Sequence, residues 1–259
     1  MDLGLQGKRA IVCGASRGLG FATAAELHRA GVAVTVVARH ADTIAAAAEQ
    51  LRSGGGAEVT AVAADVATAQ GRAAVLAAQP APDILINNAG GPPSGDWRQL
   101  QLSDWQQALE ANMLSAIALM QATLDGMAER GFGRVVNITS GSVKMPMVGL
   151  DLSNGARAGL TGFCRGIANH YVARNVTINN ILPGLHETER LDSLFAAQAE
   201  ARGVDAEQVR AAMLAAVPAG RFGTAQEFGA AAAFLCSANA GFITGQNLLL
   251  DGGVFPGAL

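Results

Sequence analysis

Ser153 and Arg157 stand four residues apart at the start of a helical pattern that follows the strand-like run GRVVNITS at 133–140. Side chains four apart on a helix share one face, so the hydroxyl and the guanidinium are expected to lie together. The hydroxyl is a weak acid, and arginine has a pKa above about 12, which makes it a poor proton shuttle. The pair offers hydrogen-bond donors and a lasting positive charge, and the question is whether it carries a reaction.

A glycine-rich turn, CGASRGLG at 13–20, offers a second chemistry, the binding of phosphate. Glycine lets the backbone approach a pyrophosphate, whose charge the free N–H groups of the following helix stabilise. A strand before and a helix after are the context of a dinucleotide-binding turn, although the spacing is G-x-x-x-G-x-G. A plain glycine-rich turn is the alternative. The residues expected to contact a cofactor here are Gly14, Ser16, Arg17, Gly18, Leu19 and Gly20.

The second strand-like run ends in Arg39 and His40. Sites selective for NAD place an acid at this point to bind the ribose hydroxyls, whereas a 2′-phosphate favours arginine. Arg39 and Arg17 could therefore bracket a phosphate with charge-assisted hydrogen bonds. The alternative is that Arg39 is an exposed strand-end residue. The sequence favours NADP(H) over NAD(H).

Apolar strand-like runs alternate with helical patterns along the chain. The runs lie at 9–13, 32–38, 57–64, 83–87, 134–140, 175–182 and 246–250, and the helical stretches near 18–30, 42–52, 68–79, from Ser103, 153–173 and 225–236. The strands are continuously apolar, which predicts a parallel sheet covered by helices on both faces. The predicted fold is α/β, a Rossmann-like doubly wound sheet forming a single domain over 1–259. Two capping boxes, Ser103-x-x-Gln106 and Thr224-x-x-Glu227, mark helix starts.

Three segments are expected to shape a substrate pocket: the loops 91–95 and 142–152, and the insertion 187–218. The second loop is rich in Val, Met and Leu, which fits an apolar substrate, although such residues are more often part of a core. The insertion is long, Ala-rich and contains Gly203 and Pro218, so it is expected to be a mobile lid.

The composition excludes several classes of protein. Half of the 259 residues are hydrophobic and the net charge is −3, which fits a compact chain without the basic patch that nucleic acid or anionic membranes require. The cysteines Cys13, Cys164 and Cys236 have no metal-ligand spacing and are expected to be buried thiols, so no metal site is expected. With no apolar signal core and no membrane-spanning run, a cytoplasmic location is expected.

The motifs together resemble those of the short-chain dehydrogenase/reductase family, nearest its 3-oxoacyl-ACP reductase-like members, over nearly the whole chain. The family's usual threonine before the glycine motif is Cys13 here. Further residues that match the family's cofactor contacts are Asp65, Val66, Asn88, Ala89, Gly90, Pro183, Gly184 and Thr188. The resemblance implies an NADP(H)-dependent oxidoreductase that acts on a small-molecule carbonyl or alcohol and forms a homotetramer.

The chain departs from the family at its catalytic residues. Asn112 and Ser140 match the catalytic asparagine and serine, but the family's Tyr-x-x-x-Lys, expected thirteen residues after the serine, is Ser153 and Arg157. The chain's one tyrosine, Tyr171, stands near the end of the same helix, so no shift of register restores the motif. In the family the tyrosine passes the proton, and the lysine lowers the pKa of the tyrosine and binds the nicotinamide ribose. Arg157 retains a charge that can bind the ribose hydroxyls.

Three interpretations remain open. In the first, carbonyl reduction persists, because Ser140 and a water held by Ser153 or Asn112 supply the proton at a rate about 10²–10⁴ lower. In the second, Lys144 or His186 is the replacement acid, although each also fits a surface residue. In the third, the chain binds NADP(H) without catalysis as a sensor or partner subunit, and Ser153 caps a helix. Oxidoreductase activity is favoured over the third.

Overall fold

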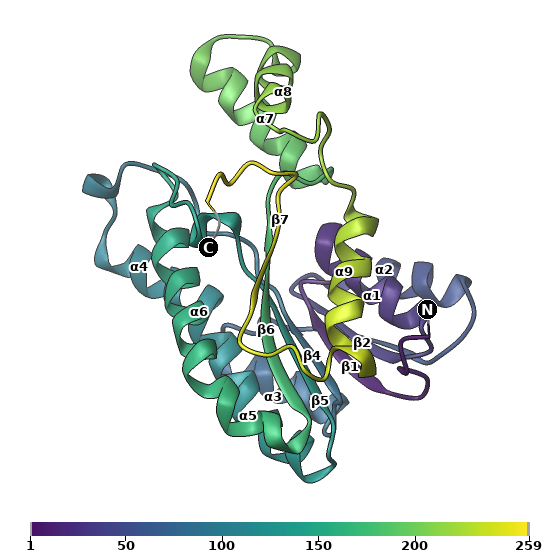
Figure 1. Cartoon of the computed structure of the whole chain (residues 1–259). Helices are drawn as coiled ribbons and strands as arrows, with labels where there is room; N and C mark the ends of the chain where they lie inside the picture. The colour runs from purple at the N-terminus through teal and green to yellow at the C-terminus, as the bar shows by residue number, and fades with distance from the viewer. Residues whose placement is uncertain (1, 258–259) are drawn as a thin grey trace.

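The structure is a computed structural model that describes residues 2–257. Its centre is one sheet of seven strands in the order β3-β2-β1-β4-β5-β6-β7, in which each neighbouring pair is parallel (Figure 1). The strands are β1 Arg9–Cys13, β2 Ala33–Ala38, β3 Val59–Ala63, β4 Ile84–Asn87, β5 Gly133–Ile138, β6 Val176–Pro183 and β7 Asn247–Leu250. The strand order reverses between β1 and β4, which is where a doubly wound sheet binds its ligand.

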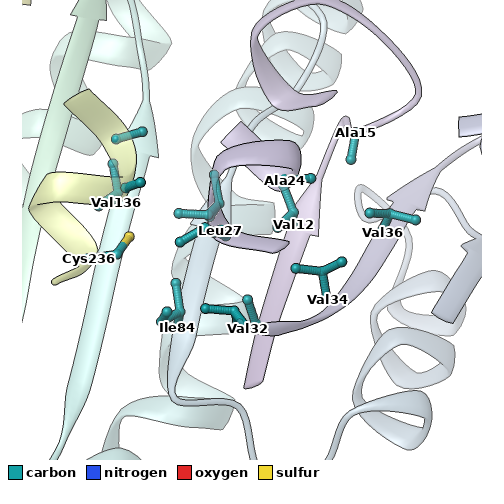
Figure 2. Close-up of a cluster of buried hydrophobic side chains, with 14 of the residues drawn as sticks. Val12, Ala15, Ala24, Leu27, Val32, Val34, Val36, Ile84, Val136 and Cys236 are labelled. Carbon is teal, nitrogen blue, oxygen red and sulfur yellow. The ribbon is translucent and has the colours of Figure 1, made fainter. Parts of the chain in front are cut away.

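Helices cover both faces of the sheet (Figure 1). They are α1 Gly18–Arg29, α2 Ala41–Ser53, α3 Ala69–Ala78, α4 Leu102–Leu109, α5 Ser115–Glu129, α6 Asp151–Tyr171, α7 Glu189–Arg202, α8 Ala206–Ala215 and α9 Ala225–Cys236. Successive side chains of a strand point to opposite faces. Val12 therefore packs with Leu27 of α1 and Cys236 of α9, as Figure 2 shows, whereas Ile11 packs with Leu124 and the rest of the α3, α5 and α6 cluster. The predicted doubly wound fold is confirmed.

Of the two predicted capping boxes, one is right and one is wrong. Thr224 and Glu227 form the predicted capping box, with the Thr224 hydroxyl accepting from the Glu227 N–H at 3.1 Å. The box at Ser103 is wrong, because α4 begins at Leu102 and Asp104 accepts from the backbone N–H of Gln101 at 2.8 Å. The helix expected near 153–173 is α6, which runs from 151 to 171.

The insertion predicted as a lid folds into two helices, α7 and α8, which stand apart from the sheet at the top of Figure 1. They share a small apolar core of their own with residues that follow them. Its buried members are Leu191, Phe195, Ala199, Val209, Val217 and Phe222. A separate core lets these helices move as a unit, and their role as a lid remains a prediction.

Arg134, at the start of β5, is buried to 1% exposure and has no carboxylate partner in the described chain. Its guanidinium donates to the backbone carbonyls of Ser237, Gly133 and Asn175 and stacks on Phe132 with 4.3 Å to the ring centre. It ties α9's end to the amino edge of the sheet, far from the carboxyl edge where ligands bind.

The three cysteines are buried and free, as the sequence predicts. Over residues 2–257, no three or more His, Cys, Asp and Glu side chains are grouped to hold a metal ion. Within the same range, no helix has both the length and the hydropathy needed to cross a bilayer.

Candidate active site

The predicted site residues gather at the carboxyl edge of the sheet. Gly14 follows β1, Asn88 follows β4, Ser140 follows β5 and Gly184 follows β6. Parallel strands bring these segments to one edge, so residues separated by more than a hundred positions become neighbours.

The glycine turn has no room for a side chain at Gly14 or Gly20. Gly14 and Gly18 both have φ of 60°, a region that favours glycine, and a Cβ on Gly20 would collide with the Gly14 carbonyl. The Asn88 amide donates to that carbonyl at 3.2 Å and fixes the turn. Arg17 at the N-cap of α1 makes no side-chain cap, so the free N–H groups of the first turn are left for an anion. Ser16 and Leu19 are half-buried in the same turn.

The adenine end of the predicted cofactor site is open. Arg39 is exposed at the end of β2, and Asp65 and Val66 follow β3, the strand that pairs with β2 through Ala38 and Ala63. Arg39 and Asp65 therefore share one end of the crevice.

Arg17, which the sequence predicts to bracket a phosphate with Arg39, pairs in this structure with Glu189, the first residue of α7, with 2.5 Å between Nη1 and Oε2. Its role at the phosphate remains a prediction. Both side chains are more than two-thirds exposed, so water screens the pair and its net strength is small.

The loop after β6 closes over the glycine turn. Pro183 ends β6, and a Cβ on Gly184 would lie 2.6 Å from the Cα of Asp251, so only glycine fits there. Thr188 lies beside the turn, since its Cγ2 is 3.7 Å from the point where a Cβ on Gly18 would be. This brings the predicted pyrophosphate and nicotinamide ends together.

Ser153 and Arg157 are in direct contact on α6. The guanidinium Nε donates to the Ser153 hydroxyl oxygen at 3.2 Å, and both residues are less than a tenth exposed. Nη1 donates to the Ile138 carbonyl at 3.0 Å and Nη2 to the Ala89 carbonyl at 3.3 Å. Arg157 thus joins α6 to the ends of β5 and β4. The expectation that Ser153 caps the helix is wrong, because Leu150 is the N-cap residue.

Burial and, to a smaller extent, the nearby Arg190 cation lower the pKa of Arg157 to about 10. The group remains charged at neutral pH. Because the Ser153 oxygen accepts from Arg157, its own O–H is free to donate to another oxygen.

Asn112 lies in a π-helical segment, Glu110–Leu114, that separates α4 from α5. Sequence reasoning placed it on a regular helix and missed this distortion. Its amide donates to the Ala108 carbonyl at 3.3 Å, while its buried Oδ1 has no partner. A cavity of about 20 Å³, lined by Asn112, Arg157 and Asn88 among others, lies beside it. That volume holds roughly one water.

Ser140 lies at the mouth of the site, where its hydroxyl oxygen accepts from the Ser142 N–H at 3.1 Å. The two proposed replacement acids lie elsewhere. Lys144 points to the C-terminal segment, with Nζ 5.8 Å from the centre of the Phe255 ring. The His186 ring is buried edge-on to Phe228, and burial lowers its pKa. The burial of His186 argues against its access to a substrate, and a role of Lys144 remains a prediction.

One residue of the site was missed from the sequence. Arg190, the second residue of α7, lays its guanidinium on the backbone of Gly91, with Cζ and Nη1 3.0 Å from where a Cβ would be. No spacing rule connects these two residues, which are brought together by the fold.

Comparison with known proteins agrees with this geometry. The family described as enoyl-(acyl carrier protein) reductase matches residues 14–255. The 3-oxoacyl-[acyl-carrier-protein] reductases FabG of Vibrio cholerae and Pseudomonas aeruginosa are each 34% identical, covering 98% of this chain and 99% of theirs. L-sorbose reductase from Gluconobacter frateurii, solved with NADPH and L-sorbose, superposes with a TM-score of 0.92 at 30% identity, covering 98% of each chain. The chain belongs to the short-chain dehydrogenase/reductase family of oxidoreductases.

Proposed function

We propose that this chain is an NADP(H)-dependent reductase of a carbonyl, of the 3-oxoacyl type or another ketone, in which Ser153 donates the proton. The observation that carries the proposal is the hydrogen bond from Arg157 Nε to the Ser153 oxygen. In the family, a lysine lies beside the tyrosine that donates the proton; here Arg157 lies beside Ser153 in the same way. The relatives support the reaction class, since FabG is named as a 3-oxoacyl reductase and the sorbose reductase was solved with NADPH.

The residues present fit NADP(H). The glycine turn and the uncapped start of α1 suit the pyrophosphate, and exposed Arg39 suits a 2′-phosphate. When bound, the cofactor supplies or accepts a hydride. The remaining work falls to the chain: Ser140 polarises the carbonyl oxygen, and Arg157 supports the ribose with its charge.

The proton route starts at Ser153. A positive charge beside a hydroxyl favours its ionised form, so Arg157 makes Ser153 a stronger acid than a free serine. The cavity beside Asn112 and Arg157 can hold a water that returns a proton to the site. Serine remains a weaker acid than tyrosine, so a slow enzyme is expected.

The alternative function is a catalytically silent NADP(H)-binding protein that acts as a sensor or partner subunit. One observation favours it: Arg157 is anchored to two backbone carbonyls, which is a sufficient structural reason for its presence. The cofactor residues serve either function, so only turnover separates the two.

The decisive experiment follows NADPH oxidation against a panel of carbonyls, including β-ketoacyl thioesters, with wild type, Ser140→Ala and the double variant Ser153→Tyr/Arg157→Lys. Turnover by the wild type that Ser140→Ala removes supports the reductase. Turnover by the double variant alone supports the silent protein.

The site's surroundings add two predictions. Met145, Met147 and Val148 are exposed on the loop after β5, which fits the apolar part of a substrate. We also propose a cytoplasmic homotetramer, with α7 and α8 as its lid. The assembly is supported by two exposed apolar side chains, Leu248 on the edge strand β7 and Phe242 five residues before that strand. Light scattering coupled to size exclusion should give the mass of four chains.

A further inference from the structure

Arg190 brings a second guanidinium to the proposed reaction centre. It reaches from α7 onto Gly91, while Arg157 reaches from α6 onto the Ala89 carbonyl. Ala89 and Gly91 are two residues apart in one loop, so their Cα atoms are separated by no more than about 7.6 Å. The Arg190 cation also contributes to the lowered pKa of Arg157, as a nearby like charge does.

Neither cation has an anionic partner among residues 2–257. Several other arginines of the structure pair with acids, as Arg17 does with Glu189 and Arg221 with Glu227. Arg157 has five N–H donors, of which one each goes to Ser153, Ile138 and Ala89. Two remain, one for the cofactor's ribose and one for an anion. At 7% exposure, water reaches these donors poorly.

Two close cations without an acid repel each other, and an anion between them would relieve the repulsion. A carboxylate suits the position, because its two oxygens match the planar fork of a guanidinium. Arg157 also touches Ser153, so an anion held by Arg157 lies near the carbonyl that Ser153 would protonate. The reacting carbonyl and the anion are then parts of one small molecule.

We propose that the substrate is an oxo acid whose carboxylate is bound between Arg157 and Arg190, a few bonds from the reacting carbonyl. The proposal rests on the reductase function above and narrows its substrate class. The cofactor's phosphates are the other possible source of an anion. The structure favours the substrate, because the phosphate cradle is the glycine turn beside Thr188, whereas Arg190 lies on Gly91, at the start of the predicted substrate loop.

Calorimetry with unreactive probes tests whether the anion at Arg190 is the substrate's carboxylate or a phosphate of the cofactor. Oxamate, which carries a carboxylate beside a carbonyl, and its neutral counterpart oxamide are titrated into the chain with and without NADP⁺. The variants are Arg190→Gln, Arg190→Lys and, as a matched control, Arg202→Gln, which removes an exposed arginine from the last turn of the same helix.

Wild type and Arg202→Gln are expected to bind oxamate at least about tenfold more tightly than oxamide, the scale of a hydrogen-bonded charge pair. Arg190→Gln should lose that preference, Arg190→Lys should retain part of it, and all four proteins should bind NADP⁺ equally. An absent preference in wild type, or its survival in Arg190→Gln, overturns the proposal. So does a tenfold loss of NADP⁺ affinity in Arg190→Gln, which would assign Arg190 to the cofactor.

Turnover is measured separately with NADPH, a 2-oxo acid and its amide. If wild type prefers oxamate to oxamide but shows no turnover, the carboxylate site is supported and the reductase function is refuted. Turnover of the amide as fast as the acid retains the reductase and refutes the carboxylate site.

Discussion

Removing the Ser153 hydroxyl should damage catalysis much more than stability. In Ser153→Ala, the Nε–H of buried Arg157 loses its acceptor, which costs about 1–3 kcal/mol of unfolding free energy. For a chain of this size, the melting temperature should fall by roughly 2–4 °C for each kcal/mol. If the hydroxyl is the proton donor, kcat should fall by about 10²–10⁴.

Thr161 provides a matched control. It lies on the same helix and is also 8% exposed, and its hydroxyl donates to the backbone carbonyl of Arg157 at 2.8 Å. Thr161→Val removes that hydrogen bond with little change of shape, so roughly 1 kcal/mol of stability should be lost and kcat should be unchanged. Thermal unfolding, NADPH affinity and single-turnover NADPH oxidation are measured on all three proteins.

If Ser153→Ala retains kcat within about threefold of wild type while its melting temperature falls as predicted, the Ser153 hydroxyl is not the proton donor. The Ser153 hydroxyl would then serve only as the hydrogen-bond acceptor of Arg157 Nε, and a water would have to donate the proton. Equal losses of kcat in Ser153→Ala and Thr161→Val would point instead to a general distortion of α6.

Four further predictions follow from the same structure. Arg39→Ala should weaken NADPH binding by about tenfold and leave NADH binding unchanged, by fluorescence titration; a uniform loss would contradict the 2′-phosphate role. Gly20→Ala should abolish NADPH binding because its Cβ collides with the glycine turn, whereas Gly162→Ala on α6, where a Cβ meets nothing within 4 Å, should not. Arg134→Met should cost roughly 3 kcal/mol in denaturant unfolding without changing NADPH affinity, because several carbonyls lose their donor. Burial lowers the pKa of His186, so the unfolded chain takes up a proton near pH 6.5 before the folded chain does. Stability should fall as pH drops below 6.5, and less steeply in His186→Gln.

The parts of the fold set by local pattern were predictable. Continuously apolar strands and the glycines at 14, 18 and 20 determined the sheet, its covering helices and the phosphate cradle. The position of Ser153 thirteen residues after Ser140 was also predictable, because it depends only on spacing along the chain.

What depends on contacts across the fold was not predictable. The partner of Arg17 and the position of Arg190 are set by where the fold places α7, and no local pattern encodes that. The π-segment at Asn112 was missed because such segments are rare, single-turn features inside an α-helical pattern. At the start of α4, the predicted cap Ser103 lies two residues after the observed one, Gln101, whose backbone N–H donates to Asp104.

The three-way anchoring of Arg157 has an evolutionary consequence. Arg157→Lys alone would leave acceptors at Ser153, Ile138 or Ala89 without their donor, since a lysine has no fork to span them. Ser153→Tyr alone would place a phenol where the guanidinium now lies. Each single step back toward the family's common pair therefore passes through a less stable protein. The serine–arginine pair is held in place by epistasis, so a lineage that acquires it tends to keep it.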